Sequence, residues 1–159
     1  MISGATPSRM KTMIFGMAGF LVSQAAFSSV ETPQTLSLEY ARQIAAKAEA
    51  YGKKKGWNLS IAIVNSEGNL TYFQRDPQAY VGSIDAAIEK AKSSNAFQRP
   101  TSAFVDGIKQ GRTGLVSVKG VVALEGGVPI LLKGVHAGAI GVSGAKSSED
   151  EEAAKAALE

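Results

Sequence analysis

The stretch that decides the fold runs from Gly138 to Glu152 and reads GAIGVSG-AKSS-EDEE. Its first seven residues are small or apolar, as in a buried strand, and glycines inside a strand mark close approach by other backbone. Ser148 and Glu151 have the spacing of a capping box, and acidic residues favour the positive end of a helix dipole. The stretch therefore predicts a closely packed strand that turns directly into a helix.

The beginning of the chain has the layout of a secretory signal peptide. Arg9 and Lys11 form a basic segment, and the apolar run over 13–22 that follows is too short to span a bilayer. Small residues then precede a predicted cleavage site after Ser28. An uncleaved membrane anchor is the alternative. Cleavage predicts a periplasmic or secreted protein with no stable membrane span.

The rest of the chain is long enough for one domain only. We predict a signal peptide over 1–28, a linker over 29–35 and a single domain over 36–159. The formal net charge is +3, and it falls to +1 when the two basic residues of the leader are removed. This balance is not that of a nucleic-acid-binding protein, so no nucleic-acid partner is expected.

Sulfur is missing from the predicted mature chain. The sequence has no cysteine, and its four methionines all precede residue 28. The one histidine is His136. A disulfide framework and a zinc site of nitrogen and sulfur ligands are therefore excluded.

Hydrophobic periodicity predicts four helices and five strands. Helices are expected at about 36–54, from Ser83, from Thr101 or Ser102, and from Ser148 to about 158. Strands are expected at 59–64, 70–75, 116–124, 128–132 and 135–142. Lys133-Gly134 predicts a two-residue hairpin turn, and Pro129 predicts an edge strand or a strand start. An early hairpin and three late consecutive strands favour an α+β antiparallel sheet with packed helices, in the order α-β-β-α-α-β-β-β-α.

Several short motifs together resemble one known family. They are Lys90-Ala91, Phe97, Pro100-Thr101, Gly126-Gly127-Val128-Pro129-Ile130, the 138–144 stretch and Asp150-Glu151. Over about 36–158 they resemble the GlcG/HbpS-like haem-binding (haem-degrading) family. The resemblance implies a profilin-like domain that self-associates and takes haem as its cofactor. Haem degradation or peroxide chemistry is implied by the resemblance only, so the sequence leaves open whether the protein is an enzyme.

A haem site needs an apolar slot, an iron ligand and cations for the propionates. Without sulfur, the strong ligands left are His136 and the tyrosines, among which Tyr80 lies in a predicted loop. On a regular strand, His136 shares a face with Gly138, Ile140 and Val142. The alternative for His136 is a solvated histidine at a hairpin end.

The resemblance points to a second place for the haem. It implies a haem-contacting threonine at Thr101, for which a simple N-cap role is the alternative. Phe97 and Phe104 could line an apolar slot or belong to the core. Arg99 could pair with a propionate.

Two carboxylates form a candidate metal site. Glu149 and Glu152 resemble an iron-binding ExxE pair, because residues three apart share one face of a helix. Complementation of the helix dipole is the alternative.

Two functions follow from these observations. The first is an exported haem- or tetrapyrrole-binding protein that sequesters or relays haem. The second is a non-catalytic small-metabolite-binding or accessory protein of a periplasmic oxidation pathway.

Overall fold

A computed structural model describes Met1, Gly4 and residues 35–159. The predicted signal peptide and linker lie outside the described residues, apart from residues 1, 4 and 35. The described residues from Thr35 onward belong to one compact unit. Within the described part of the chain, no helix is long and apolar enough to cross a bilayer.

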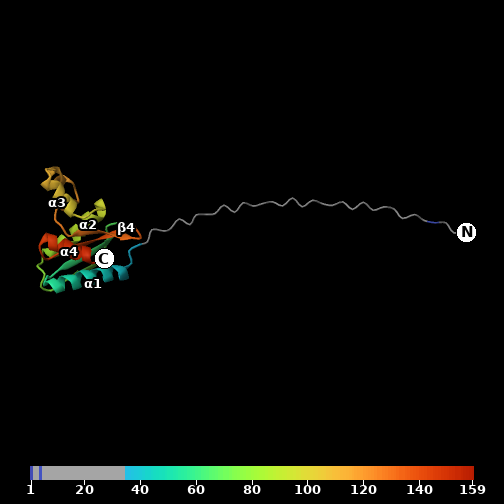
Figure 1. Cartoon of the computed structure of the whole chain (residues 1–159), viewed down its shortest axis with the longest axis horizontal. Coiled ribbons are helices and arrows are strands. Elements are labelled where there is room, and N and C mark those ends of the chain that lie inside the picture. The colour runs from blue at the N-terminus through green and yellow to red at the C-terminus, as the bar shows by residue number, and fades with distance from the viewer. Residues whose placement is uncertain (2–3, 5–34) are drawn as a thin grey trace. The chain divides into compact units, whose positions relative to one another are not determined.

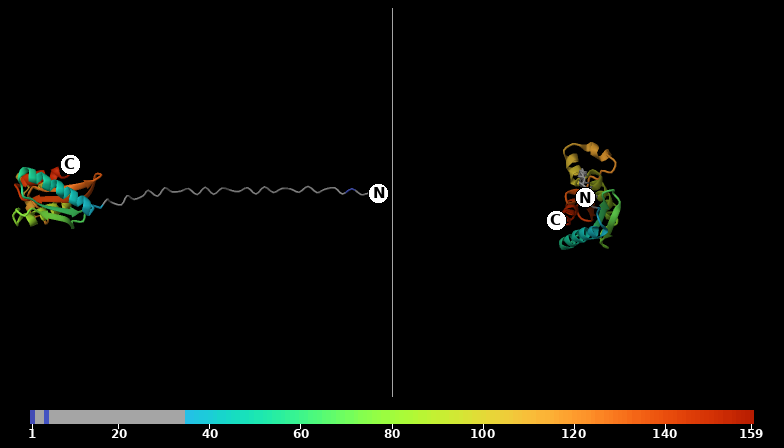
Figure 2. Two further views of the ribbon diagram at one scale, coloured as in Figure 1. Left: turned by 90° about the horizontal axis from the view of Figure 1, so that it is seen from below. Right: turned by 90° about the vertical axis from the view of Figure 1, so that its right-hand side faces the viewer.

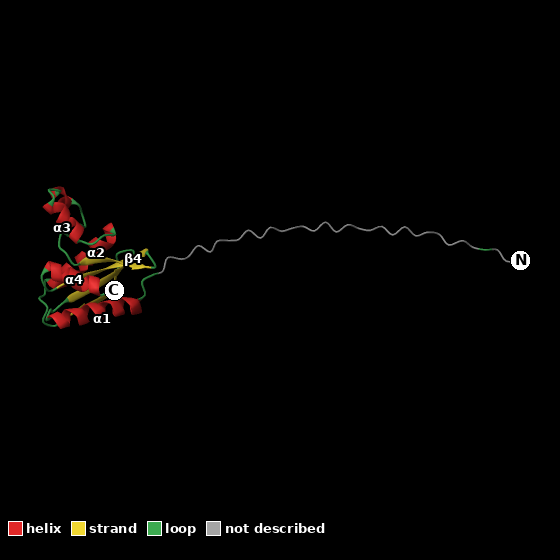
Figure 3. Cartoon of the chain, viewed as in Figure 1, coloured by secondary structure: helices red, strands yellow, loops and turns green. Residues whose placement is uncertain are grey.

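The domain alternates helices with antiparallel strands (Figure 3). In chain order the elements are α1 (Leu38–Lys55), β1 (Ser60–Asn65), β2 (Leu70–Arg75), α2 (Ser83–Phe97), α3 (Ser102–Lys109), the 3-10 helix η1 (Thr113–Ser117), β3 (Gly127–Leu132), β4 (Val135–Ser143) and α4 (Ser147–Ala156). The sheet has the order β2-β1-β4-β3, and every neighbouring pair is antiparallel. The predicted α+β class is confirmed.

Local sequence signals set several element ends. The Ser37 hydroxyl accepts a hydrogen bond from the Tyr40 N–H at 3.1 Å and so caps α1, and Gly56 ends the helix at a φ of 77°. Lys133 and Gly134 have φ values of 50° and 81° between β3 and β4. Positive φ at both central residues is what a type I′ hairpin turn requires. The Lys133-Gly134 turn is therefore the one that the sequence predicts.

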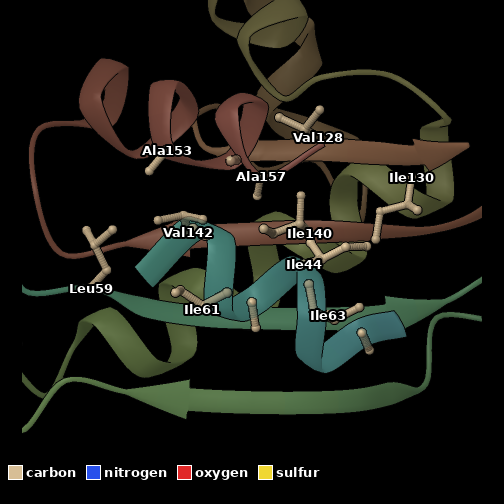
Figure 4. Close-up of a cluster of buried hydrophobic side chains, with 14 of the residues drawn as sticks. Ile44, Leu59, Ile61, Ile63, Val128, Ile130, Ile140, Val142, Ala153 and Ala157 are labelled. Atoms are coloured by element: carbon tan, nitrogen blue, oxygen red, sulfur yellow. The ribbon is translucent and has the colours of Figure 1, made fainter. Parts of the chain in front are cut away.

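One face of the sheet carries the main hydrophobic core (Figure 4). Large apolar side chains of β1, β3 and β4 point toward α1 and α4 and are buried between the layers; they include Ile61, Ile63, Val128, Ile130, Ile140 and Val142. Period-2 alternation along each strand places them on the same face. Pro129 lies on β3, which is an edge strand as predicted.

The other face is covered by α2 and is lined by small residues. Ala62 and Ala139 of the sheet pack on Ala87 and Ala91 of the helix. A methyl group added to Gly141 would overlap the backbone oxygen of Ala87. The helix lies this close to the strand because Gly141 has no side chain, which explains the glycine-interrupted strand of the sequence.

The strand predicted over 116–124 is wrong. This stretch is the end of η1 followed by irregular backbone and turns. Residues 101–124, comprising α3, η1 and this loop, form a projection that we call the arm. In Figures 1 and 2 the part of the arm around α3 lies on the side of the domain opposite to α1. At its base, the Val122 N–H donates to the Ser93 hydroxyl at 2.9 Å and ties the loop to α2.

The helix after β4 also begins differently from the prediction. Lys146 is the N-cap residue of α4, and its backbone N–H donates to Glu149 Oε2 at 3.0 Å. The carboxylate that caps the helix is thus Glu149, and Glu151 is turned into the protein. Asp150 sits between them and is buried.

Candidate functional site

The structure distributes the predicted haem residues over separate places. Phe97, Arg99, Thr101 and Phe104 lie where α2 joins α3. His136 is at the start of β4, beside the end of α2. Tyr80 precedes α2, near the end of β4.

Thr101 is fully buried and joins the arm to the sheet. Its Oγ1 accepts a hydrogen bond from the Gly127 N–H at 3.0 Å, and its own N–H donates to the Gly127 oxygen at 2.9 Å. It occupies the N-cap position of α3, but its side chain makes no capping bond. The hydroxyl oxygen is therefore occupied by the edge of β3 and is not exposed to a ligand.

Phe97 and Phe104 form an aromatic pair at the base of the arm. Their ring centroids lie 5.2 Å apart at an interplanar angle of 77°, an edge-to-face arrangement. Phe104 is buried and Phe97 is half-buried. Arg99 is exposed beside them, and its Nε donates to the Phe97 oxygen at 3.2 Å.

The arm exposes apolar side chains next to cations. Val116 is 67% exposed, and Val118 and Leu124 are also exposed. Arg112 and Lys119 are exposed on the same segment. Among the described residues, neither of these two cations makes an ion pair or a side-chain hydrogen bond. An apolar surface beside unpaired cations suits a flat ligand that carries carboxylates.

His136 faces α2, which corrects the predicted orientation. Gly138 pairs with Ile130, whereas His136 pairs with Leu131, so Ala137 is an extra residue on β4. This β-bulge reverses the alternation of side chains before Gly138. His136 was predicted to share a strand face with Ile140 and Val142. Those two residues lie on the opposite face of the sheet, which packs against α1 and α4.

A hydrogen-bond chain fixes the imidazole of His136. Asn95 Nδ2 donates to the Ser66 oxygen at 3.1 Å, which turns Asn95 Oδ1 toward His136 Nε2 at 2.8 Å. We therefore assign the ring proton to Nε2. Nδ1 is buried and has no partner among the described residues. Burial lowers the pKa of His136, so the ring is neutral at pH 7.

Tyr80 is half exposed at the opposite end of α2. Its hydroxyl lies 3.3 Å from the Ser143 hydroxyl at the end of β4. The Ser83 hydroxyl donates a hydrogen bond to the backbone carbonyl oxygen of Tyr80, and it lies 2.7 Å from the buried Ser60 hydroxyl. Tyr80 therefore closes the start of α2 against the sheet.

Glu149 and Glu152 have different partners, although both lie on α4. Glu149 caps the helix as described above. Glu152 accepts hydrogen bonds from the Tyr51 hydroxyl and from Lys55 Nζ, both on α1. These two donors hold the pKa of Glu152 below its usual value. Among the described residues, no three or more His, Cys, Asp or Glu side chains are grouped so that they could hold a metal ion.

The sequence analysis missed a buried ion pair between α2 and α4. Lys90 Nζ lies 2.8 Å from Asp150 Oδ2 and donates to the Val142 oxygen at 3.0 Å. Asp150 Oδ1 accepts from the Ala145 N–H at 2.9 Å. The helical spacing could have predicted that Lys90 is buried. Lys90 falls on the same helical stripe as the small buried residues Ser83, Ala87 and Ser94.

A polar pocket beside α4 was also missed. It has a volume of about 320 Å³ and is lined by Glu125, Ser148, Glu151, Glu152 and Lys155. The four helical residues recur at intervals of three, one and three, which is one face of a helix. Glu125 faces them from the loop before β3.

Comparison with known proteins places the chain in a family. Its residues 36–159 match the family model described as haem degrading protein HbpS-like. Protein GlcG of Escherichia coli strain K12 is 32% identical over 114 residues, which are 72% of this chain and 85% of GlcG. The crystal structure of a Streptomyces reticuli HbpS double mutant has a TM-score of 0.73 at 28% identity, and the match covers 96% of this chain and 97% of that one.

The crystal structure of a PduOC–haem complex shares the fold, with a TM-score of 0.70 at 24% identity over 78% of this chain and 93% of that chain. The family model matches residues 36–159, which is the whole domain that carries the antiparallel sheet. The chain therefore belongs to the HbpS-like family, whose model is described as haem degrading protein HbpS-like.

Proposed function

We propose that the protein is an exported haem-binding protein that sequesters or relays haem. Membership of the HbpS-like family supports haem as the ligand. The observation in the structure that carries the proposal is the surface of the arm. Val116, Val118 and Leu124 are exposed there at an energetic cost unless something covers them.

The side chains of the arm, with Arg99 just before it, are of the kinds that a haem needs. The exposed apolar side chains would pack on the porphyrin, and Arg99, Arg112 and Lys119 would pair with its propionates. Bound haem would supply a redox-active iron. The protein's own part is to shield one face of the ring and to neutralise its carboxylates.

The candidate iron ligands are all held by other groups. His136 Nε2 is bonded to Asn95, the Thr101 oxygen to Gly127, and the Tyr80 hydroxyl to Ser143. Thr101 and Tyr80 would have to exchange these bonds for iron, whereas the second ring nitrogen of His136, Nδ1, has no hydrogen-bond partner among the described residues. His136 remains the strongest donor, because a neutral imidazole needs no deprotonation to bind a metal.

A hemin titration followed by the Soret band tests this proposal. The wild-type protein should bind hemin and keep it through gel filtration. Val116→Asp should weaken binding by about tenfold or more, because it places a charge under the ring and against the propionates. Leu38→Asp, at an exposed apolar position on α1, is the matched control and should bind as the wild type does. Failure of the wild type to bind hemin would overturn the proposal.

The same titration tests which side chain binds the haem iron. His136→Ala should remove the spectral features of a histidine-bound iron, and Tyr80→Phe tests phenolate ligation. An unchanged spectrum in His136→Ala would place the ligand elsewhere, with hemin binding itself still measured by the Soret band.

Export is proposed from the leader. The basic segment, the apolar run and the small residues before position 28 support cleavage. The intact mass of protein from the native host should correspond to a chain that begins near Ser29 or Ala26. Soluble protein that retains Met1 would contradict export by this route.

Self-association is proposed from the part of the β3 edge that lies beyond the contact between Thr101 and Gly127. Leu131 of β3 and Val135 of β4 are exposed at the β3–β4 hairpin. β3 has a neighbouring strand on one side only. An exposed edge strand with apolar residues pairs readily with another chain, and a second copy of this domain offers the same edge.

A further inference from the structure

We infer that the arm docks on an anionic lipid surface, such as the headgroup region of a bilayer that contains phosphatidylglycerol. The composition of the arm, its exposure and its position in the fold all suit such a surface, whether or not the protein also binds haem. The domain would lie on the membrane rather than in it. We call residues 107–124 the arm tip.

The arm tip carries cations and aliphatic side chains without any carboxylate. From Gly107 to Leu124 the sequence has no aspartate or glutamate, and its cations are Lys109, Arg112 and Lys119. Aromatic residues are also missing from this stretch. Protein interfaces are commonly anchored by tyrosine or tryptophan, whereas cations beside apolar side chains are attracted to anionic headgroups. The composition therefore favours a lipid surface over a protein partner.

The apolar side chains of the arm tip are exposed to water. Val116 is 67% exposed, Val118 is 44% exposed and Leu124 is 49% exposed. None of the residues of η1 is buried. Contact with the boundary between headgroups and acyl chains would remove this apolar surface from water, and that removal favours binding.

The cations of the arm tip are free to meet phosphate groups. Arg112 and Lys119 are exposed, and within the described part of the chain neither makes an ion pair or a side-chain hydrogen bond. Lys109 Nζ lies 3.9 Å from an exposed carboxylate oxygen of Asp106, and such surface pairs contribute little. A headgroup region offers phosphates beside acyl chains, which match cations beside valine and leucine.

The position of the arm lets its tip approach a flat surface. In Figures 1 and 2 the part of the arm around α3 extends from the domain on the side opposite to α1. The arm is fixed at its base, where Thr101 bonds Gly127 and the Val122 N–H donates to Ser93. Between these contacts, backbone N–H groups donate to carbonyl oxygens of the arm itself; they belong to Arg112, Leu115, Val118 and Val121. A lipid surface can therefore meet the arm tip without displacing the sheet.

Sedimentation with sucrose-loaded vesicles tests the inference on the full-length processed protein. The protein is free of haem, because haem and lipid would occupy the same apolar side chains in turn. It should bind vesicles made of equal parts of phosphatidylglycerol and phosphatidylcholine. It should bind pure phosphatidylcholine vesicles about tenfold less, and added salt should weaken its binding to the anionic vesicles.

Two charge reversals show whether the arm is the part that binds. Lys119→Glu should weaken binding to the anionic vesicles by about tenfold, because a repulsion replaces an attraction. Lys54→Glu, at an exposed lysine near the end of α1, changes the net charge equally and is the matched control. It should bind as the wild type does, because α1 lies on the side of the domain opposite to the arm.

Two further variants test the apolar contact. Val118→Asp should weaken binding by about tenfold, whereas Leu38→Asp on α1 should not change it. Both positions are exposed, so both variants should unfold at the temperature of the wild type.

No binding of the wild type to anionic vesicles, equal binding to neutral vesicles, or an equal loss in Lys54→Glu would overturn the inference. Dissociation of an oligomer by Val118→Asp, seen by light scattering without lipid, would also overturn it, because a second copy would then cover the arm. Hemin binding is measured without lipid, so a failure of the proposed function and a failure here are distinguishable.

Discussion

The ammonium group of Lys90 lies 2.8 Å from the carboxylate of Asp150, and both side chains are only 2% exposed. The two residues are 60 positions apart in the sequence and come from α2 and α4. Lys90 also bonds the Val142 oxygen, and Asp150 bonds the Ala145 N–H. The pair therefore fastens two helices to the end of β4, at the turn where the sheet gives way to α4.

Breaking this pair should destabilise the fold. Lys90→Met leaves the Asp150 carboxylate buried without a counter-charge, and removal of one partner of a buried pair costs about 3–5 kcal/mol. Urea unfolding measures the loss. The double variant Lys90→Met/Asp150→Leu should recover most of it, because neither charge then remains buried. A single variant that loses less than about 1 kcal/mol would contradict the prediction that an uncompensated charge at Asp150 is costly.

Gly141 should not tolerate any side chain. Gly141→Ala places a methyl group against the backbone of Ala87 and forces α2 away from the sheet, with a loss of about 2 kcal/mol or more. Gly114→Ala is the matched control, since nothing lies near the added methyl group and the residue does not need positive φ. Thermal unfolding compares the two. Equal melting temperatures would contradict the close packing of α2 on β4.

Stability should fall in mild acid because of His136. Burial lowers its pKa in the folded protein, while the unfolded chain keeps a value of about 6.5. The unfolded state therefore binds more protons as the pH falls below 7, and the unfolding free energy decreases until the pH passes the folded pKa. His136→Gln should flatten this part of the profile, and it is a sharp test because the chain has no other histidine.

The edge of β3 should control self-association. Leu131→Lys places a charge on the exposed edge and should shift the protein toward the monomer in light scattering. Leu38→Gln changes an equally apolar, exposed position on α1 and should leave the assembly unchanged. A wild-type protein that is monomeric at a concentration of tens of micromolar would contradict the proposed self-association.

Local signals predicted most of the fold. The strand over 70–75 has the predicted bounds, and Lys133-Gly134 forms the predicted turn. The predicted helix ends lie within a few residues of the observed ones, because capping residues and glycines determine the backbone only of adjacent residues. The strand over 116–124 failed, although the segment is apolar and β-branched. A strand needs an available edge, and at Gly127 the outer edge of β3 is bonded to Thr101.

The sequence by itself therefore determined the class of the domain, its hairpins, its helix boundaries and its resemblance to a haem-binding family, since these depend on periodicity and on local backbone chemistry. Tertiary structure decided which side chains meet. The extra residue at Ala137 turned His136 toward Asn95, and the packing of α4 brought Glu151 to Ser102 and Asp150 to Lys90. Such contacts join residues far apart in the chain, so they are fixed by the folded backbone and by the cost of burying unpaired polar groups.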